Sequence, residues 1–249
     1  MPLSGMANTP VELKLTKQNV KYTDSKHNTL NHQPNTNSQV NKMDWFKWLI
    51  RAILAGMSIG IGGIVFIQTT VACGPEFKWV GAFLFSIGLY SVLTYGFNLY
   101  TGKVGYILEN DRIYLLEVLV TIIGNFIGCF IMGHFFQFDY AVAMCEGKLE
   151  NFEFLDALMK GVMCGILMYI AVDAYKSKKS YLATFICVPV FIMAGFEHSI
   201  ADMFYFSSAM MWTPEAFLFI AVILLGNLIG CCLIPAYRMY VNKEKTQTQ

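Results

Sequence analysis

Charged residues are scarce in this sequence of 249 residues: 14% are charged, whereas 55% are hydrophobic. Soluble domains carry about 25% charged residues, so the chain is too apolar for an ordinary soluble fold of this size. Its formal net charge of only +1 gives no overall basic surface for nucleic acid, and no glycine-rich phosphate-binding motif occurs. The composition indicates an integral membrane protein and argues against nucleic-acid binding.

Sequence patterns typical of disulfides and metal sites are also missing. The seven cysteines include no C-x-x-C pair, and the four histidines show no H-x-x-x-H spacing. Except for Cys145, the cysteines fall in or beside apolar runs, where they are expected to pack as small buried side chains. We therefore predict no metal and no cofactor. An enzyme using His198, Glu197 and Asp202 as acid and base is a weaker hypothesis, because the sequence offers no metal triad beside them.

The apolar residues gather in six segments. A membrane-spanning helix needs about 20 of them. Charge-free runs predict spans at 52–73, 79–102, 118–138, 161–172, 181–211 and 216–237, the fourth being short and the fifth interrupted. Residues 1–42, rich in Asn, Thr and Gln, predict a disordered polar tail; residues 43–240 form the predicted transmembrane domain, and 241–249 a short second tail.

Lysine and arginine mark one side of the predicted membrane domain. They follow spans two, four and six and occur in the first tail, whereas the opposite loops contain few. Cytoplasmic loops collect these residues, so we predict a multi-pass protein of the inner or plasma membrane with both termini in the cytoplasm. On the outer side, residues 139–156 predict an acidic loop with Lys148 as its one lysine.

A sequence repeat relates spans three and six. Residues 124–129 (G-N-F-I-G-C) match residues 226–231 (G-N-L-I-G-C) at an offset of 102 residues. Small residues at this spacing also occur wherever membrane helices pack closely, but six matching positions favour a duplication. Because each unit holds three spans, an odd number, the second unit must be inverted relative to the first. Asn125 and Asn227, one in each unit, either tie helices together or line a pathway.

The fifth span is interrupted by Glu197, His198, Ser199 and Asp202 at predicted membrane depth. Polar groups are costly there, and a helix that breaks at such residues lines a cavity. Histidine is the side chain that changes charge near neutral pH, so we expect His198 in a transport pathway. Glu197 and Ser199 are expected mainly to satisfy freed backbone groups and to set the tautomer of the histidine.

The repeat predicts a second break. The offset of 102 residues carries His198 back to Gly96, which is followed by Asn98 and Gly102 in an otherwise apolar run. These residue types tolerate turns and end helices. Spans two and five are therefore both predicted to break, facing each other across a pseudo-twofold axis near the midplane, where inverted repeats place their substrate sites.

With these motifs in place, the chain closely resembles the formate/nitrite transporter family. The resemblance covers about residues 45–240 and rests on G-F-E-H-S-I-A at 195–201, L-Y-T at 99–101 and the paired Gly-Asn motifs. It implies an aquaporin-like six-helix fold, a homopentamer with one pore in each protomer, and transport of small monovalent anions of weak acids across the lipid bilayer.

The resemblance also implies roles for individual residues. The pore histidine matches His198, and the loop threonine matches Thr101. The vestibule lysine matches Lys148, with Lys160 as the competitor because one extra residue separates Lys148 from the fourth span. The implied constrictions are an outer pair and an inner slit, formed respectively by Phe85 and Phe191 and by Leu89, Leu99 and Tyr100.

Three positions depart from the pattern of the family. Tyr100 replaces the usual phenylalanine and adds a hydroxyl at the inner slit. Asp202 stands where the family more often has asparagine, and Gly165 follows Cys164 where asparagine is common. Each departure is expected to alter hydrogen bonding near the pore.

The expected function is a channel or transporter for weak-acid anions, formate first among them. Lys148 would concentrate the anions, and the neutral acid crosses apolar constrictions at a lower cost than the anion. Permeation is then linked to protons through His198, which either relays a proton or only orients and polarises the substrate held by Thr101. Nitrite, hydrosulfide and lactate are alternative substrates. A neutral-solute channel of the aquaporin type is disfavoured because neither break carries Asn-Pro-Ala.

Overall fold

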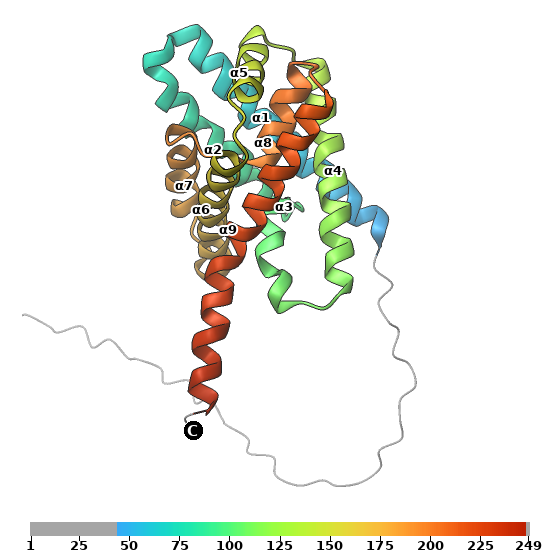
Figure 1. The fold of residues 1–249 in the computed structure, drawn as a ribbon, viewed down its shortest axis with the longest axis vertical. Helices are drawn as coiled ribbons and strands as arrows, with labels where there is room; N and C mark the ends of the chain where they lie inside the picture. The colour runs from blue at the N-terminus through green and yellow to red at the C-terminus, as the bar shows by residue number, and fades with distance from the viewer. Residues whose placement is uncertain (1–43, 248–249) are drawn as a thin grey trace, which may run out of the picture. The chain divides into compact units, whose positions relative to one another are not determined.

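The computed structural model describes residues 44–247, with side chains to residue 243, and within this range all regular secondary structure is helical (Figure 1). The predicted tail at 1–42 lies outside the described residues. The elements in chain order are α1 (Trp45–Cys73), η1 (Pro75–Phe77), α2 (Lys78–Tyr95), α3 (Tyr100–Lys103), η2 (Val104–Glu109), α4 (Ile113–Phe135), α5 (Asp139–Glu150), α6 (Phe154–Lys178), α7 (Leu182–Met193), α8 (Ser199–Ser208) and α9 (Pro214–Gln247).

Five helical segments in the described range are long and apolar enough to cross a membrane. They are Trp45–Cys73, Pro75–Tyr95, Ile113–Phe135, Phe154–Lys178 and Pro214–Lys243. The remaining predicted span, 181–211, consists of the two short helices α7 and α8. Helix α6 extends well beyond the charge-free run 161–172 on both sides, because charged side chains at helix ends can reach the membrane surface while the helix continues.

The acidic stretch after the third span is folded differently from the prediction. Residues 139–156 were expected to form a loop, but α5 occupies Asp139–Glu150 and α6 begins at Phe154. Ala, Met, Leu, Glu and Lys are strong helix formers, so this polar segment is helical without being a span. One consequence is that Lys148 lies in the last turn of a helix.

Two helix pairs form the matching halves of the scaffold. Helix α1 packs against α4, and α6 packs against α9. A Cβ atom on Gly128 would collide with the backbone oxygen of Ile53, and one on Gly230 would collide with that of Val162. The glycines of the sequence repeat are therefore the sites where the two backbones of each pair touch.

Both predicted breaks are present. Helix α2 ends at Tyr95 and α3 begins at Tyr100, while α7 ends at Met193 and α8 begins at Ser199. Each break starts with a glycine in the left-handed region, Gly96 at φ 66° and Gly195 at φ 71°. This conformation is costly for any residue with a Cβ, so glycine ends both helices.

The register between the two breaks differs from the predicted one. Gly96 and Gly195 are 99 residues apart, and at the same offset Leu99, the N-cap of α3, corresponds to His198, the N-cap of α8. The prediction that His198 corresponds to Gly96 was wrong by three residues. The number of residues between the glycine of the break and the repeated Gly-Asn motif differs in the two halves. One offset therefore cannot align both the breaks and the motifs. Figure 1 shows α3 in the middle of the bundle, where it contacts α4, α6 and α9.

Candidate functional site

The first break is held by Asn125 of α4. Its Nδ2 donates to the backbone oxygens of Ala52 and Asn98, both at 2.8 Å, and its Oδ1 accepts the backbone N–H of Tyr100 at 2.9 Å. The side chain is fully buried. A broken helix frees backbone groups that lipid cannot satisfy, and this amide satisfies one on each side of the gap.

The second break is held by Asn227 of α9 in the same way. Its Nδ2 donates to the backbone oxygens of Gly161 and Glu197, both at 2.9 Å, and its Oδ1 accepts the N–H of Ser199 at 2.9 Å. The sequence left open whether the two asparagines tie helices or line the pathway. All three side-chain bonds of each go to backbone, so both asparagines tie the breaks to the scaffold.

Two cysteines of the repeat connect each half of the scaffold to the break in the other half, which the sequence motif alone does not predict. The Sγ of Cys129 in α4 lies 3.2 Å from the backbone oxygen of Ile200, and the Sγ of Cys231 in α9 lies 3.5 Å from that of Thr101. Both positions were visible in the repeated G-N-x-I-G-C motif, but a weak thiol donor has no sequence signature of its own.

His198 and Thr101 meet where the two breaks face each other. The Nε2 of His198 lies 3.0 Å from the Oγ1 of Thr101, and both residues are buried. The Nδ1 of His198 accepts the backbone N–H of Ala201 at 3.1 Å and so caps α8. Because a backbone N–H can only donate, Nδ1 must present its lone pair, and the neutral ring carries its proton on Nε2. Nε2 is therefore the donor to Thr101.

Two aromatic rings pack beside His198. Phe85 and Phe191 lie edge to face with centroids 6.2 Å apart, and Phe191 stacks on the ring of His198 at 5.7 Å. Both phenylalanines are buried. An ion next to these faces would lose most of its water, whereas a neutral solute would lose much less.

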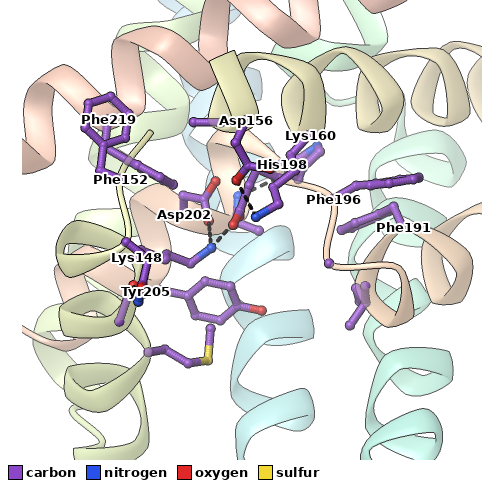
Figure 2. A pocket seen from close by; sticks show the side chains of 18 of the residues that line it. Lys148, Phe152, Asp156, Lys160, Phe191, Phe196, His198, Asp202, Tyr205 and Phe219 are labelled. Atoms are coloured by element: carbon purple, nitrogen blue, oxygen red, sulfur yellow. Dashed lines mark hydrogen bonds and ion pairs between the residues drawn. The ribbon is translucent and has the colours of Figure 1, made fainter. Parts of the chain in front are cut away.

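A cavity of about 410 Å³ lies next to His198 and Phe191 (Figure 2). Lys148 of α5 points into it, and its Nζ pairs with Glu197 Oε2 and, at 3.1 Å, with Asp202 Oδ1. The side chains of Lys148 and Glu197 are 15% exposed and that of Asp202 only 2%. The lysine is thus a largely buried ion-pair partner and not a freely solvated surface charge.

Lys160, the competing candidate, also lines this cavity. Its Nζ pairs with Asp156 Oδ2 at 2.6 Å within α6, and both side chains are about half exposed. Its backbone oxygen accepts the N–H of Glu197 at 3.3 Å. The Lys148 ammonium pairs with Glu197 and Asp202 of the histidine motif, whereas the Lys160 ammonium pairs with Asp156, so the geometry favours Lys148 as the vestibule lysine.

The three residues predicted for the inner slit are all buried. Leu89, Leu99 and Tyr100 are each at most 2% exposed, and Leu99 lines a second cavity of about 120 Å³ that also includes Lys103 and Lys176. The Tyr100 hydroxyl donates to the backbone oxygen of Leu224 at 2.8 Å. The hydroxyl of Tyr100 therefore ties the start of α3 to α9.

Gly165, a second departure, has a steric reason in this chain. A Cβ atom there would lie 2.5 Å from the backbone oxygen of Asn227 and 3.0 Å from the backbone N of Cys231. No side chain fits at that distance, so α6 and α9 can approach only with glycine at this position. The third departure, Asp202, was not among the predicted pathway residues, but it joins Lys148 and Glu197 in the cavity.

A sequence model of the formate/nitrite transporter family matches residues 27–241. The chain belongs to this family. Among its relatives, a formate-nitrite transporter of Plasmodium falciparum is 27% identical over 77% of this chain and 77% of its own length. The formate channel FocA of Escherichia coli K12 is 27% identical over 76% of this chain and 84% of its own.

Solved structures agree on the fold. A pentameric formate channel with formate bound is 24% identical, with a TM-score of 0.66 over 80% of this chain and 97% of its own. An FNT family ion channel is 18% identical, with a TM-score of 0.73 over 82% and 92%. Since a formate/nitrite transporter is a transporter or channel and not an enzyme, and since the described residues contain five long apolar helices, this chain is a multi-pass membrane transport protein.

Proposed function

We propose that this formate/nitrite transporter is a homopentameric channel for small monovalent weak-acid anions, with formate as its main substrate. Residues 43–240 form the transmembrane domain, an aquaporin-like arrangement of six spans in two inverted repeats with the second and fifth broken. The names of the relatives and of the solved pentameric channel support this assignment. The lysine and arginine distribution supports a cell-membrane location with both termini in the cytoplasm.

The observation that carries the proposal is the hydrogen bond between His198 and Thr101 across the two breaks. A carboxylic acid has one acceptor oxygen and one hydroxyl, and it needs a donor and an acceptor at the midplane. His198 Nε2–H can donate to a substrate oxygen in place of Thr101, and the Thr101 hydroxyl can turn to serve the other oxygen. The pair thus offers a small acid the hydrogen-bond partners that the apolar constrictions on either side do not provide.

This geometry favours one of the two roles left open for the histidine. Protonation of Nδ1 would remove the acceptor that caps α8, because the backbone N–H of Ala201 would then face an N–H. His198 therefore acts as a neutral hydrogen-bond donor that orients and polarises the substrate. Permeation is still linked to protons, since the species that crosses the Phe85 and Phe191 pair is the neutral acid.

Lys148 acts at the entrance. Its ammonium lies in the cavity next to His198, and it attracts an anion from the outer solution. The paired carboxyl groups of Glu197 and Asp202 limit that attraction, so capture is weak and release into the constriction is easy. A channel needs this balance, because a tightly held ion would not move on.

The test is uptake by proteoliposomes of the purified protein, comparing formate, nitrite, hydrosulfide, lactate and glycerol at pH 5 and pH 7. We expect saturable formate uptake that increases with acidity. Faster uptake of nitrite, hydrosulfide or lactate would identify that anion as the main substrate and would leave the assignment as an anion channel unchanged. Glycerol passage without anion passage would overturn the proposal in favour of a neutral-solute channel, and chemical conversion of any of these acids would identify an enzyme.

A further inference from the structure

The cavity next to His198, which we call the outer cavity, contains one largely buried ammonium between two carboxyl groups. Lys148 pairs with both Glu197 and Asp202, and these two residues also act on each other as like charges. If both carboxyl groups were ionised, the cluster would carry a net charge of −1 next to the route of an anion. Such a charge would repel the anion and would leave one buried carboxylate incompletely neutralised.

Asp202 is the member of the cluster with an unsatisfied atom. Its Oδ1 accepts from Lys148, whereas its Oδ2 is buried and has no hydrogen-bond partner among the described residues. The side chain is 2% exposed and lines the cavity. A bare carboxylate oxygen in this position is costly, whereas a protonated oxygen there removes the charge that burial penalises.

We propose that Glu197 and Asp202 together retain one proton near neutral pH and that this acid pair donates it to the captured anion. This inference rests on the proposed function. Two carboxyl groups that share a site cannot both ionise at low cost, and one ammonium compensates only one of them.

The groups around Asp202 are consistent with this assignment. Lys148 pairs with it, Glu197, His198 and Tyr205 line the same cavity, and its charge also acts on Cys145 of α5 and Cys164 of α6. Lys148 is the cation in this set, and it already binds both carboxyl groups. The other charged and titratable residues that line the same cavity are Lys78, Tyr140, Asp156 and Lys160.

The step is a single proton transfer. The O–H bond of the acid pair breaks, a new O–H bond forms on the anion, and the pair is left with both carboxyl groups ionised next to Lys148. The neutral acid then crosses between Phe85 and Phe191, and hydronium from the outer solution reprotonates the pair through the cavity. Each cycle moves one anion together with one proton.

The test compares the pH profile of formate uptake in wild type and in Asp202→Asn, which keeps the shape but cannot give up a proton. The fraction of formate that is already neutral in water falls about a hundredfold between pH 5.5 and pH 7.5. Formate uptake by wild type, which has its own proton donor, should fall by much less than a hundredfold over that range. Formate uptake by Asp202→Asn should fall in parallel with the neutral fraction, by about a hundredfold.

Glu146→Gln is the matched control, because it removes one carboxylate from an exposed position of α5. It should keep the wild-type profile. Identical profiles for wild type and Asp202→Asn would overturn the inference while leaving anion transport intact. Absence of anion uptake in wild type itself would instead overturn the proposed function.

A second readout does not depend on transport. In infrared spectra of the purified protein recorded at different pH values, we expect the carbonyl band of a buried carboxylic acid at neutral pH. This band should disappear in Asp202→Asn. In Glu197→Gln the band should disappear at a lower pH than in wild type, because the negative charge of Glu197 no longer disfavours ionisation of Asp202. A spectrum of Asp202→Asn that matches wild type would overturn the assignment of the proton to this pair.

Discussion

The two breaks of this transporter share a scaffold but differ in chemistry. Both start with a left-handed glycine and both are tied by a buried asparagine from the repeated motif. At the equivalent N-cap positions, however, the first break has Leu99 and the second has His198. Leu99 offers no side-chain cap, whereas His198 caps α8 and also reaches Thr101.

This difference separates what builds the pathway from what acts in it. The duplicated glycines and asparagines make two gaps in the helices, and lipid requires that the freed backbone groups be satisfied in each of them. A single histidine then gives one gap a donor and an acceptor, while the other gap contributes Thr101. The comparison can be tested by breaking the shared part first and the different part afterwards.

The largest effect is expected from the shared part. Asn125→Ala and Asn227→Ala each remove three hydrogen bonds to buried backbone groups, which should lower the free energy of unfolding by about 3 kcal/mol or more. Denaturant titration of the purified protein measures this. Asn151→Ala, which removes one bond from an exposed side chain, should change stability by less than about 0.5 kcal/mol. If Asn125→Ala and Asn227→Ala lowered the free energy of unfolding by very different amounts, the two breaks would not be equivalent.

The second effect concerns the two lysines of the outer cavity. Burial alone would lower the pKa of Lys148, but the carboxylates of Asp202 and Glu197 raise it above its ordinary value. A raised lysine pKa contributes stability at every pH below the ordinary lysine range and loses it only above that range, so the contribution is complete between about pH 5 and 8. Lys148→Ala should therefore cost about 2 kcal/mol throughout this window, less than a fully buried pair because the side chains are partly exposed.

Lys160→Ala is the control for that prediction. It breaks an exposed pair with Asp156 and should cost less than about 1 kcal/mol. In uptake assays, Lys148→Ala should weaken transport at low formate concentration more than at saturation. If Lys160→Ala shows this kinetic effect instead, the vestibule lysine has been assigned to the wrong residue.

The third effect removes the difference between the breaks. His198→Phe keeps an aromatic ring but loses both hydrogen bonds, so we expect a protein that still assembles, is about 1 kcal/mol less stable through the lost cap, and conducts poorly. His198→Gln restores an amide N–H near the position of Nε2 without a titrating group. Partial uptake by His198→Gln with the wild-type pH profile supports a neutral donor. No uptake by either variant would favour a histidine that itself carries the proton.

The smallest effect compares the residues that follow the two N-caps. Tyr100→Phe loses the bond to Leu224 and should cost about 0.5 to 1 kcal/mol. Ser199→Ala removes a buried hydroxyl that has no hydrogen-bond partner among the described residues, so it should be neutral or slightly stabilising. The free energies of unfolding of the two variants decide this. A larger loss for Ser199→Ala would mean that its hydroxyl has a partner during folding or assembly.

Much of this architecture could be predicted from the sequence. The charge-free runs located five long helices, and the polar interruption of the fifth span located the second break, because membrane helices tolerate polar residues only where a cavity receives them. The repeated G-N-x-I-G-C motif predicted the first break. It misplaced the partner of His198 by three residues, since the lengths between break and motif differ in the two halves.

Other features had no local signal. The stretch at 139–156 is too polar for a membrane span, and its acidic residues favoured the prediction of a loop. Helix α5 forms there because several of its residues have high helix propensity. The sequence did not predict that Lys148 pairs with Glu197 and Asp202, which lie about fifty residues away along the chain. Such pairs depend on how α5 packs over the second break.

The sequence by itself determined the class of the protein, the positions of its spans and breaks, and the residues that end the helices, because hydrophobic length, glycine conformation and buried polar groups are local properties. The tertiary structure alone decided which atoms meet. It placed Nε2 of His198 against Thr101, gave Nδ1 to the cap of α8, and enclosed Lys148 between two carboxyl groups. Hydrogen bonds and ion pairs act only over a few ångströms, so their partners are fixed by packing and not by spacing along the chain.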